Sequence, residues 1–141
     1  MTTVVEAKRV AEAPDKLWRE IGRFGAIGDW HPMVTRVESE GEREGAMRVA
    51  EDRTGARHRE RLLEIAPERR FYRYRMEATP MPVRDYVGEF EVRDNGDGSS
   101  MVVWTAKFNA AAPDAPGAIE AVQTFLKAGL SDLKARYGAR R

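Results

Sequence analysis

Histidine is the residue type in this chain best suited to proton transfer near neutral pH. His31 and His58 are its only two histidines, and cysteine is absent. Without cysteine the chain has no thiolate nucleophile, no disulfide and no cysteine-ligated metal. His31 stands between Trp30 and Pro32 at the expected end of a short helix. Its imidazole is therefore a candidate ligand-binding or acid–base group, and a ring bonded only to backbone groups is the alternative.

Other catalytic patterns are missing from the sequence. It contains no glycine-rich phosphate loop, no HExxH and no GxSxG. The serines fall in turns, at strand ends or on an exposed helix face, with no histidine close in sequence. His58 begins its strand beside the turn at Gly55, which makes it a weaker candidate than His31. We expect no nucleophilic catalysis, no metal site and no cofactor.

The elements that must position these side chains follow from periodicity and turn signals. Alternating polarity predicts strands, and the run Asn95-Gly96-Asp97-Gly98 is a strong hairpin signal. Apolar residues at spacings of three and four predict a C-terminal helix over 114–137. Strands are expected over 3–11, 34–40, 46–51, 58–65, 71–77, 86–94 and 99–108, and short helices over 15–21 and 24–29.

Composition limits the classes of function. The 141 residues fit one domain, 1–141, and 24 basic residues against 23 acidic ones leave a net charge of +1. A nearly neutral chain lacks the positive field that nucleic-acid binding needs, so we expect no nucleic-acid partner. The sequence has no secretory leader pattern and no apolar run long enough for membrane insertion. A cytoplasmic protein is expected.

The element order predicts an α+β fold, and several segments carry a family resemblance. They are LWREIGRFGAIGDWHP (17–32), GARHRERLLEI (55–65), YRYRM (72–76), PMPVRDYVGEFEV (80–92), SMVVWTAKF (100–108) and GLSDLKARY (129–137). In this order they resemble the SRPBCC or START-like superfamily, most closely its bacterial polyketide cyclase/dehydrase-like group. The resemblance implies a helix-grip fold, in which a strongly bent seven-stranded antiparallel sheet wraps around a long C-terminal helix.

Strand parity suggests which side chains face a cavity between this sheet and helix. Tyr86 and Phe90 share one side of their strand, and Gly88 between them leaves volume opposite the small helix residues Ala121 and Gly129. Ordinary core packing is the alternative for each aromatic residue. The residues expected to contact a ligand are Trp30, Glu60, Leu62, Tyr72, Tyr74, Tyr86, Gly88, Phe90, Trp104, Phe108, Ala121, Val122, Phe125 and Gly129.

The apolar pattern of strand 58–65 does not choose its inward face, but the resemblance does. It implies that Glu60 of the ERL motif and Tyr86 of the DY motif point into the cavity. Glu60 is then a candidate polar anchor or proton-transfer group. A surface glutamate paired with an arginine is the alternative. The resemblance also places two loops, 52–57 and 79–84, where they could gate the cavity.

Three functions follow as hypotheses. The first is binding of a small hydrophobic molecule, aromatic or polycyclic. The second is a polyketide cyclase, aromatase or dehydratase in which Glu60, His31 and Tyr86 act as acid–base groups. The third is a protein-interaction module. Leu63, Ile65 and Phe71 face outward and could form a homodimer contact, or could pack beneath the N-terminal segment.

Overall fold

Short turns between alternating segments allow consecutive strands to pair as an antiparallel meander. The computed structural model describes residues 1–110 and 115–138. Its strands are β1 (Thr2–Val10), β2 (Val34–Ser39), β3 (Met47–Asp52), β4 (Arg57–Ala66), β5 (Phe71–Ala78), β6 (Val83–Asp94) and β7 (Ser100–Ala110). Its helices are α1 (Pro14–Ile21), α2 (Ile27–Trp30) and α3 (Ala115–Gly138), with single 3₁₀ turns at Phe24–Ala26 and Pro67–Arg69.

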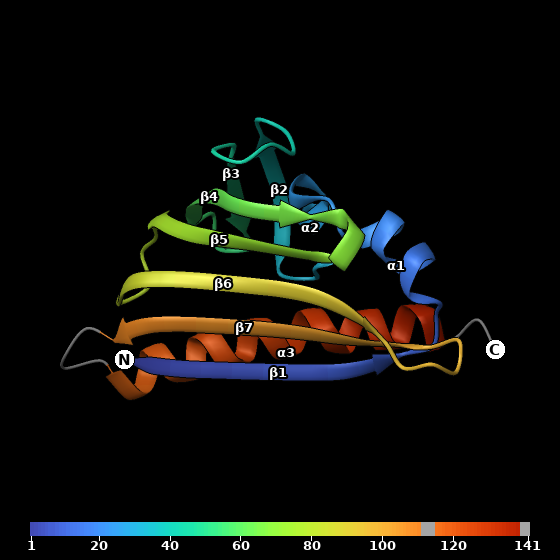
Figure 1. The fold of residues 1–141 in the computed structure, drawn as a ribbon. Coiled ribbons are helices and arrows are strands. Elements are labelled where there is room, and N and C mark those ends of the chain that lie inside the picture. Colours follow the sequence, from blue (N-terminus) through green and yellow to red (C-terminus); the bar gives the residue numbers. More distant parts are fainter. Residues whose placement is uncertain (111–114, 139–141) are drawn as a thin grey trace.

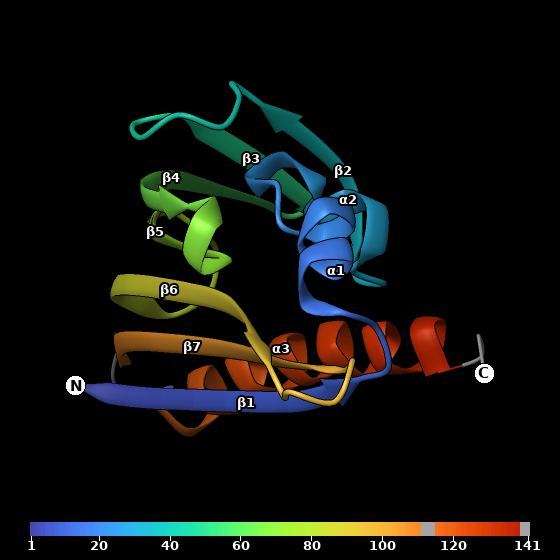
Figure 2. The same ribbon diagram turned by 45° about the vertical axis from the view of Figure 1, so that its right-hand side comes forward.

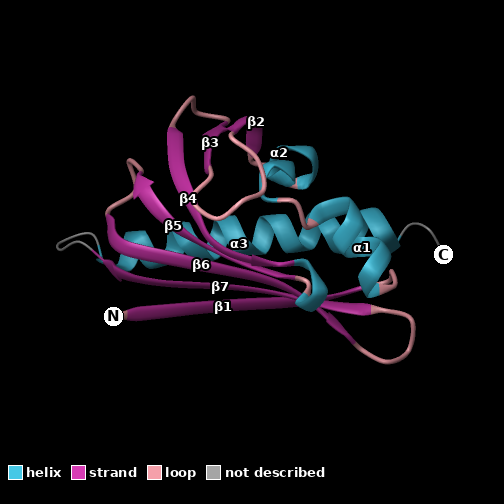
Figure 3. Ribbon diagram, turned by 45° about the horizontal axis from the view of Figure 1, so that its top comes forward, coloured by secondary structure: helices cyan, strands magenta, loops and turns pink. Residues whose placement is uncertain are grey.

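All seven strands form one antiparallel sheet in the order β1-β7-β6-β5-β4-β3-β2 (Figure 1). Helix α3 runs along β1 and β7, while α1 and α2 lie between α3 and the far strands β2 and β3 (Figure 2). Strands β2, β3 and β4 rise away from α3 (Figure 3). The predicted helix-grip architecture is therefore confirmed. None of the described helices is both long and apolar enough to cross a membrane.

One end of the space between sheet and helix is filled by an aromatic core. Trp30 of α2 stacks on Phe90 of β6 with ring centroids 5.5 Å apart, and Phe90 meets Trp104 of β7 edge-on at 5.3 Å. Tyr72 stacks on the same Phe90 at 5.3 Å. Each of these side chains is at most 2 % exposed. Close packing at this end leaves open space only towards the other end of the sheet.

Two glycines permit close approaches within this interior. A Cβ on Gly88 would overlap the ring of Tyr74, and a Cβ on Gly129 would lie 2.6 Å from Cδ2 of His31 and 3.0 Å from the Trp104 ring. The space above each glycine is thus occupied by an aromatic side chain. A ligand contact at either glycine stays a prediction.

The outer face of the sheet carries cross-strand ion pairs. Arg73 on β5 bonds Glu89 on β6 through Nε and Oε2 at 2.8 Å, as the strand register requires. Phe71 lies under the guanidinium groups of Arg69 and Arg73, at 5.2 and 5.3 Å from its ring centroid. Ile65 packs partly against the core. A homodimer contact through this region stays a prediction.

Gly129→Ala should destabilise the protein, although alanine is favoured over glycine within helices by about 1 kcal/mol. The added methyl group would press on His31 and Trp104, and overpacking of a core costs about 1–3 kcal/mol. Gly117→Ala in the same helix is the control, because a Cβ there meets nothing within 4 Å. Urea denaturation should give a lower unfolding free energy for the first variant only. Equal stabilisation of both variants would contradict this packing.

Candidate functional site

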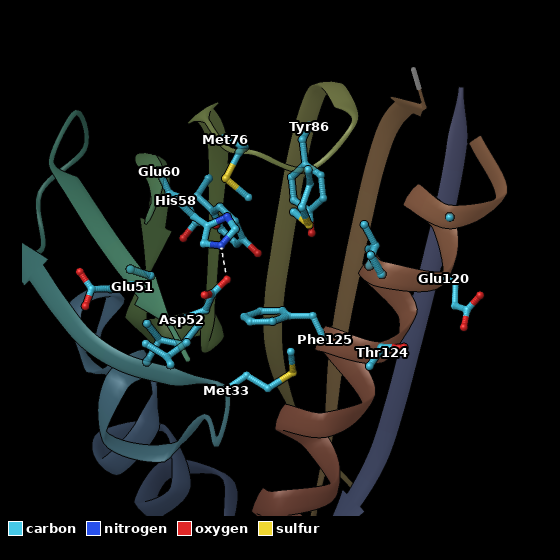
Figure 4. A pocket seen from close by; sticks show the side chains of 18 residues that line it. Met33, Glu51, Asp52, His58, Glu60, Met76, Tyr86, Glu120, Thr124 and Phe125 are labelled. Atoms are coloured by element: carbon cyan, nitrogen blue, oxygen red, sulfur yellow. Dashed lines mark hydrogen bonds and ion pairs between the residues drawn. The ribbon is translucent and has the colours of Figure 1, made fainter. Parts of the chain in front are cut away.

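A cavity of about 450 Å³ lies between α3 and the strands that rise away from it (Figure 4). Its wall takes side chains from α2, β2, β3, β4, β5, β6 and α3, and from the loops beside them. The lining residues are Ile27, Met33, Val34, Ala50, Glu51, Asp52, His58, Glu60, Tyr74, Met76, Met81, Tyr86, Gly117, Glu120, Ala121, Val122, Thr124 and Phe125. A volume of this size fits a small organic molecule.

The structure divides the residues expected to contact a ligand into two groups. The group in the cavity wall consists of Glu60, Tyr74, Tyr86, Ala121, Val122 and Phe125. The second group lies in the packed interior and does not line the cavity: Trp30, Leu62, Tyr72, Gly88, Phe90, Trp104, Phe108 and Gly129. The strand residues of both groups lie on the inward face of the sheet, but α1 and α2 cover only one end of that face. The alternation of side chains along a strand therefore identifies the inward residues, but it does not distinguish those that pack in the core from those that line the cavity.

Tyr86 owes its position to a bulge in β6. The β6–β7 register shifts between Arg84 and Val87, and Asp85 adopts a left-handed conformation with φ 54°. Aspartate tolerates this conformation, and bulges re-aim side chains. The Tyr86 ring stacks on Phe108 with centroids 5.6 Å apart and is 3 % exposed. Burial raises the pKa of the Tyr86 phenol, and the negative charge of Glu60 raises it further. Its hydroxyl is thus a hydrogen-bond donor at neutral pH.

Glu60 meets the cavity as one member of a buried ion pair. Arg48 on β3 stands directly opposite Glu60 on β4, and its Nε donates to Oε1 at 2.7 Å. Arg48 is fully buried and Glu60 is 6 % exposed. No described residue donates a hydrogen bond to the second oxygen, Oε2, and Glu60 lines the cavity. The carboxylate therefore presents an open acceptor to a bound molecule.

Arg48 connects this pair to the rest of the interior. Its Nη1 donates to the carbonyl of Phe24 at 2.6 Å and to the Tyr72 hydroxyl at 3.3 Å. Its guanidinium also lies 4.1 Å from the Phe24 ring centroid and 4.9 Å from that of Tyr74. Burial by itself lowers the pKa of Arg48, but Glu60, Tyr72 and Tyr74 together outweigh this effect and the net shift of the pKa is upward. Arg48 is therefore a permanent cation.

His31 lies in the interior, outside the cavity wall, with both ring nitrogens bonded to backbone. The backbone N–H of Met33 donates to Nδ1 at 3.1 Å, so Nε2 carries the proton and donates to the carbonyl of Phe125 at 2.9 Å. The ring stacks on Phe125 with centroids 4.0 Å apart. Burial lowers the pKa of His31 to about 4. His31 thus matches the alternative considered from the sequence, a ring bonded only to backbone groups. A neutral ring with both nitrogens bonded has no free nitrogen for proton transfer.

His58 lies in the cavity wall instead, at the mouth. Its Nε2 bonds Asp52 Oδ2 at 3.0 Å and its Nδ1 bonds the Thr79 hydroxyl at 2.8 Å. Burial raises the pKa of Asp52, but hydrogen bonds from His58 and Thr54 outweigh it and lower the pKa to about 2. The ionised Asp52 therefore accepts a hydrogen bond from the Nε2–H of His58. Through this contact His58 ties the β3–β4 turn to the β5–β6 loop, which are the two loops expected to gate the cavity.

Several functional candidates were not found by sequence reasoning. Arg48 was missed because the pattern of β3 suggests that Val49 faces inward, whereas Arg48 and Ala50 do. Asp52 and His58 flank one hairpin turn, and this spacing was an available signal for their contact. Met33 and Met81 lie in loops, where periodicity carries no information. Their positions depend on the fold.

The order of elements and the cavity can now be compared with known proteins. The sequence model of the family described as polyketide cyclase/dehydrase and lipid transport matches residues 1–138. The chain belongs to this family. A comparison with curated protein sequences finds no match.

Solved structures agree with this family membership. A protein from Thermobifida fusca is 31% identical, with a TM-score of 0.88 over 99% of this chain and 95% of that one. XoxI from Bacillus cereus is 24% identical, with a TM-score of 0.90 over 97% and 96%. The Zhui aromatase/cyclase from Streptomyces sp. R1128 is 20% identical, with a TM-score of 0.78 over 99% and 94%. At these lower identities the likeness shows the shared fold.

The protein should lose stability as the pH is lowered, because of His31. Its pKa is about 4 when folded against 6.5 ordinarily, so between these values the unfolded chain takes up a proton that the folded protein does not. The stability is complete above pH 6.5 and decreases as the pH falls towards 4, by about 3 kcal/mol in all. Unfolding titrations at each pH measure this loss. His31→Gln should flatten the curve over this window, and an unchanged slope in that variant would assign the loss to other groups.

Proposed function

We propose that this protein binds a small, flat, largely apolar aromatic or polycyclic molecule between α3 and the sheet. The observation that carries the proposal is the cavity of about 450 Å³, whose inner wall is mostly aliphatic, aromatic and methionine side chains. Cavities of a few hundred Å³ with an apolar wall and few polar groups are typical small-molecule sites. Glu60 supplies the polar group at the inner wall.

The shape of the wall favours a planar ligand. Phe125 of α3 faces the β-strand side of the cavity, where Tyr86 projects from β6 (Figure 4). Aromatic faces on two sides can stack on a planar ring system. Met33, Met76 and Met81 line the same space, and methionine adapts its shape to different partners. The site thus combines fixed aromatic walls with adjustable ones.

The comparisons support the same class of ligand. The family description names polyketide cyclase, dehydrase and lipid transport, all of which concern hydrophobic or polyketide molecules. One of the structures that share this fold is an aromatase/cyclase. These relatives agree with a binding role for the cavity.

A second candidate function is acid–base catalysis on a polyketide-like substrate, as in a cyclase or dehydratase. The observation that favours it is the open Oε2 of Glu60 beside the phenol of Tyr86 in one cavity. The carboxylate could remove a proton next to a carbonyl, while the tyrosine hydroxyl donates a hydrogen bond to the enolate oxygen. His31 has no part in this candidate, because its nitrogens are bonded to backbone.

Binding can be tested with N-phenyl-1-naphthylamine, a neutral probe whose fluorescence rises in apolar surroundings. We expect saturable fluorescence and a higher melting temperature with the probe, since a ligand that binds only the folded state stabilises it. Ala121→Trp should abolish both effects because Ala121 lines the cavity. Ala135→Trp is the matched control, since Ala135 is an exposed residue of the same helix outside the cavity wall. Equal binding by both variants would place the probe elsewhere.

Catalysis makes a separate prediction. With a linear poly-β-ketone substrate, Glu60→Gln should lose about 100-fold or more in turnover, because general acid–base groups contribute roughly 10²–10⁴-fold. Binding of the neutral probe to the same variant should persist. Chromatography of the products measures turnover, and comparison with probe binding separates a loss of catalysis from a loss of binding. Full activity in Glu60→Gln would exclude Glu60 as the base.

A further inference from the structure

The ionisable side chains in the cavity wall are strongly unbalanced in charge. Apart from the phenols of Tyr74 and Tyr86, they are four carboxylates and the imidazole of His58. Among the described residues that line the cavity, no lysine or arginine is present. The whole chain is nearly neutral, with 24 basic and 23 acidic residues. The acidic character therefore belongs to this wall and does not reflect an acidic protein.

Glu60 is the innermost of these acids. It is more than nine-tenths buried, and its partner Arg48 contacts only Oε1 through Nε. Arg48 lies outside the lining set, so a molecule in the cavity meets the carboxylate of the pair and not the guanidinium. A carboxylate oxygen can only accept hydrogen bonds. A ligand must therefore supply a hydrogen-bond donor to bind the buried Oε2 of Glu60.

The other three acids of the lining set differ in how they face the cavity. Asp52, at the end of β3, points into it and is held by His58 (Figure 4). Glu51 points to the other side of β3, where it has a 3.5 Å ion pair with the half-exposed Arg57. The exposed carboxylate of Glu120 points away from the cavity and adds only a distant negative charge (Figure 4). Glu60 and Asp52 are therefore the acids that a bound molecule meets.

We propose that the cavity selects aromatic molecules that carry a protonated amine and discriminates against those that carry a carboxylate, sulfonate or phosphate. This rests on the proposed function, namely that an aromatic ligand occupies the cavity. The ring lies against Phe125 and Tyr86, and the ammonium group donates to Oε2 of Glu60. Hydrogen bonds between charged partners are stronger than those between neutral ones, and the carboxylates of Glu60 and Asp52 repel an anion.

A matched series of ligands tests this selectivity on the wild-type protein. 1-Naphthylmethylamine, 1-naphthylmethanol and 1-naphthoic acid share one ring system and differ in charge at neutral pH. Each is titrated against bound N-phenyl-1-naphthylamine, and displacement gives its affinity. We expect the amine to bind about tenfold or more tightly than the alcohol, and the acid to bind more weakly than the alcohol. Added salt should reduce the part of the difference in affinity that comes from the exposed carboxylate of Glu120.

Two substitutions assign the selectivity to named groups. Glu60→Gln should weaken the amine by about tenfold or more and leave the alcohol nearly unchanged. If this variant fails to fold because Arg48 is left without its anion, the double variant Arg48→Met/Glu60→Gln removes both charges and serves instead. Glu120→Gln should reduce the preference for the amine by about twofold or less, because this exposed carboxylate points away from the cavity. Glu68→Gln, an exposed acid away from the cavity, is the control.

The outcomes separate the two proposals. Binding of the neutral probe and the alcohol together with equal affinity for amine and acid would overturn the charge selectivity and keep the proposed function. Failure of the probe and of every naphthalene ligand to bind would contradict the proposed function, and the selectivity with it. Preference for the amine that survives both Glu60→Gln and Glu120→Gln would overturn the assignment to these residues.

Discussion

The buried contact between Arg48 and Glu60 is the interaction on which the interior of this protein depends. Removing two charges from water is costly, and a buried pair needs good geometry and further hydrogen bonds to offset that cost. Among the described residues, Nη2 is the one guanidinium nitrogen of Arg48 with no hydrogen-bond partner. Here the two residues face each other across β3 and β4, and Arg48 also binds the Phe24 carbonyl and lies beside aromatic rings. One side chain thereby connects the far strands, the segment before α2 and the aromatic core.

This pair also marks where the packed core ends and the cavity begins. Arg48 is on the core side, among Phe24, Tyr72 and Tyr74, whereas Glu60 lines the cavity. The guanidinium of Arg48 therefore lies away from the cavity, and the carboxylate of Glu60 faces it. A cavity that is apolar over most of its wall gains an acidic inner contact without losing the charge compensation that burial requires. The proposed binding function and the proposed preference for cationic ligands both rest on this arrangement.

Sequence patterns predicted the inward face of most strands, because side chains alternate along a strand whatever lies above it. The inward set of β5, β6 and β7 is found as expected, including Tyr74 and Tyr86. The pattern misleads for β3, where Arg48 is buried and Val49 is partly exposed. An arginine is buried there because a carboxylate and a carbonyl on other elements receive it, and single-strand periodicity contains no information about partners on other elements. For the same reason the pattern did not show that His31 is bonded to backbone in the interior while His58 lines the cavity.

The sequence by itself determined the α+β class, the order of strands and helices, and the family to which the chain belongs. The class and the order of elements follow from local periodicity and turn residues, and the family follows from the resemblance of segments in their order along the chain. Only the tertiary structure decided which inward residues pack as core and which bound a cavity. That division depends on where α1, α2 and α3 cover the sheet, on the ring that occupies the space above each glycine, and on which charges pair across strands. All of these are contacts between residues far apart in sequence, so no local pattern specifies them.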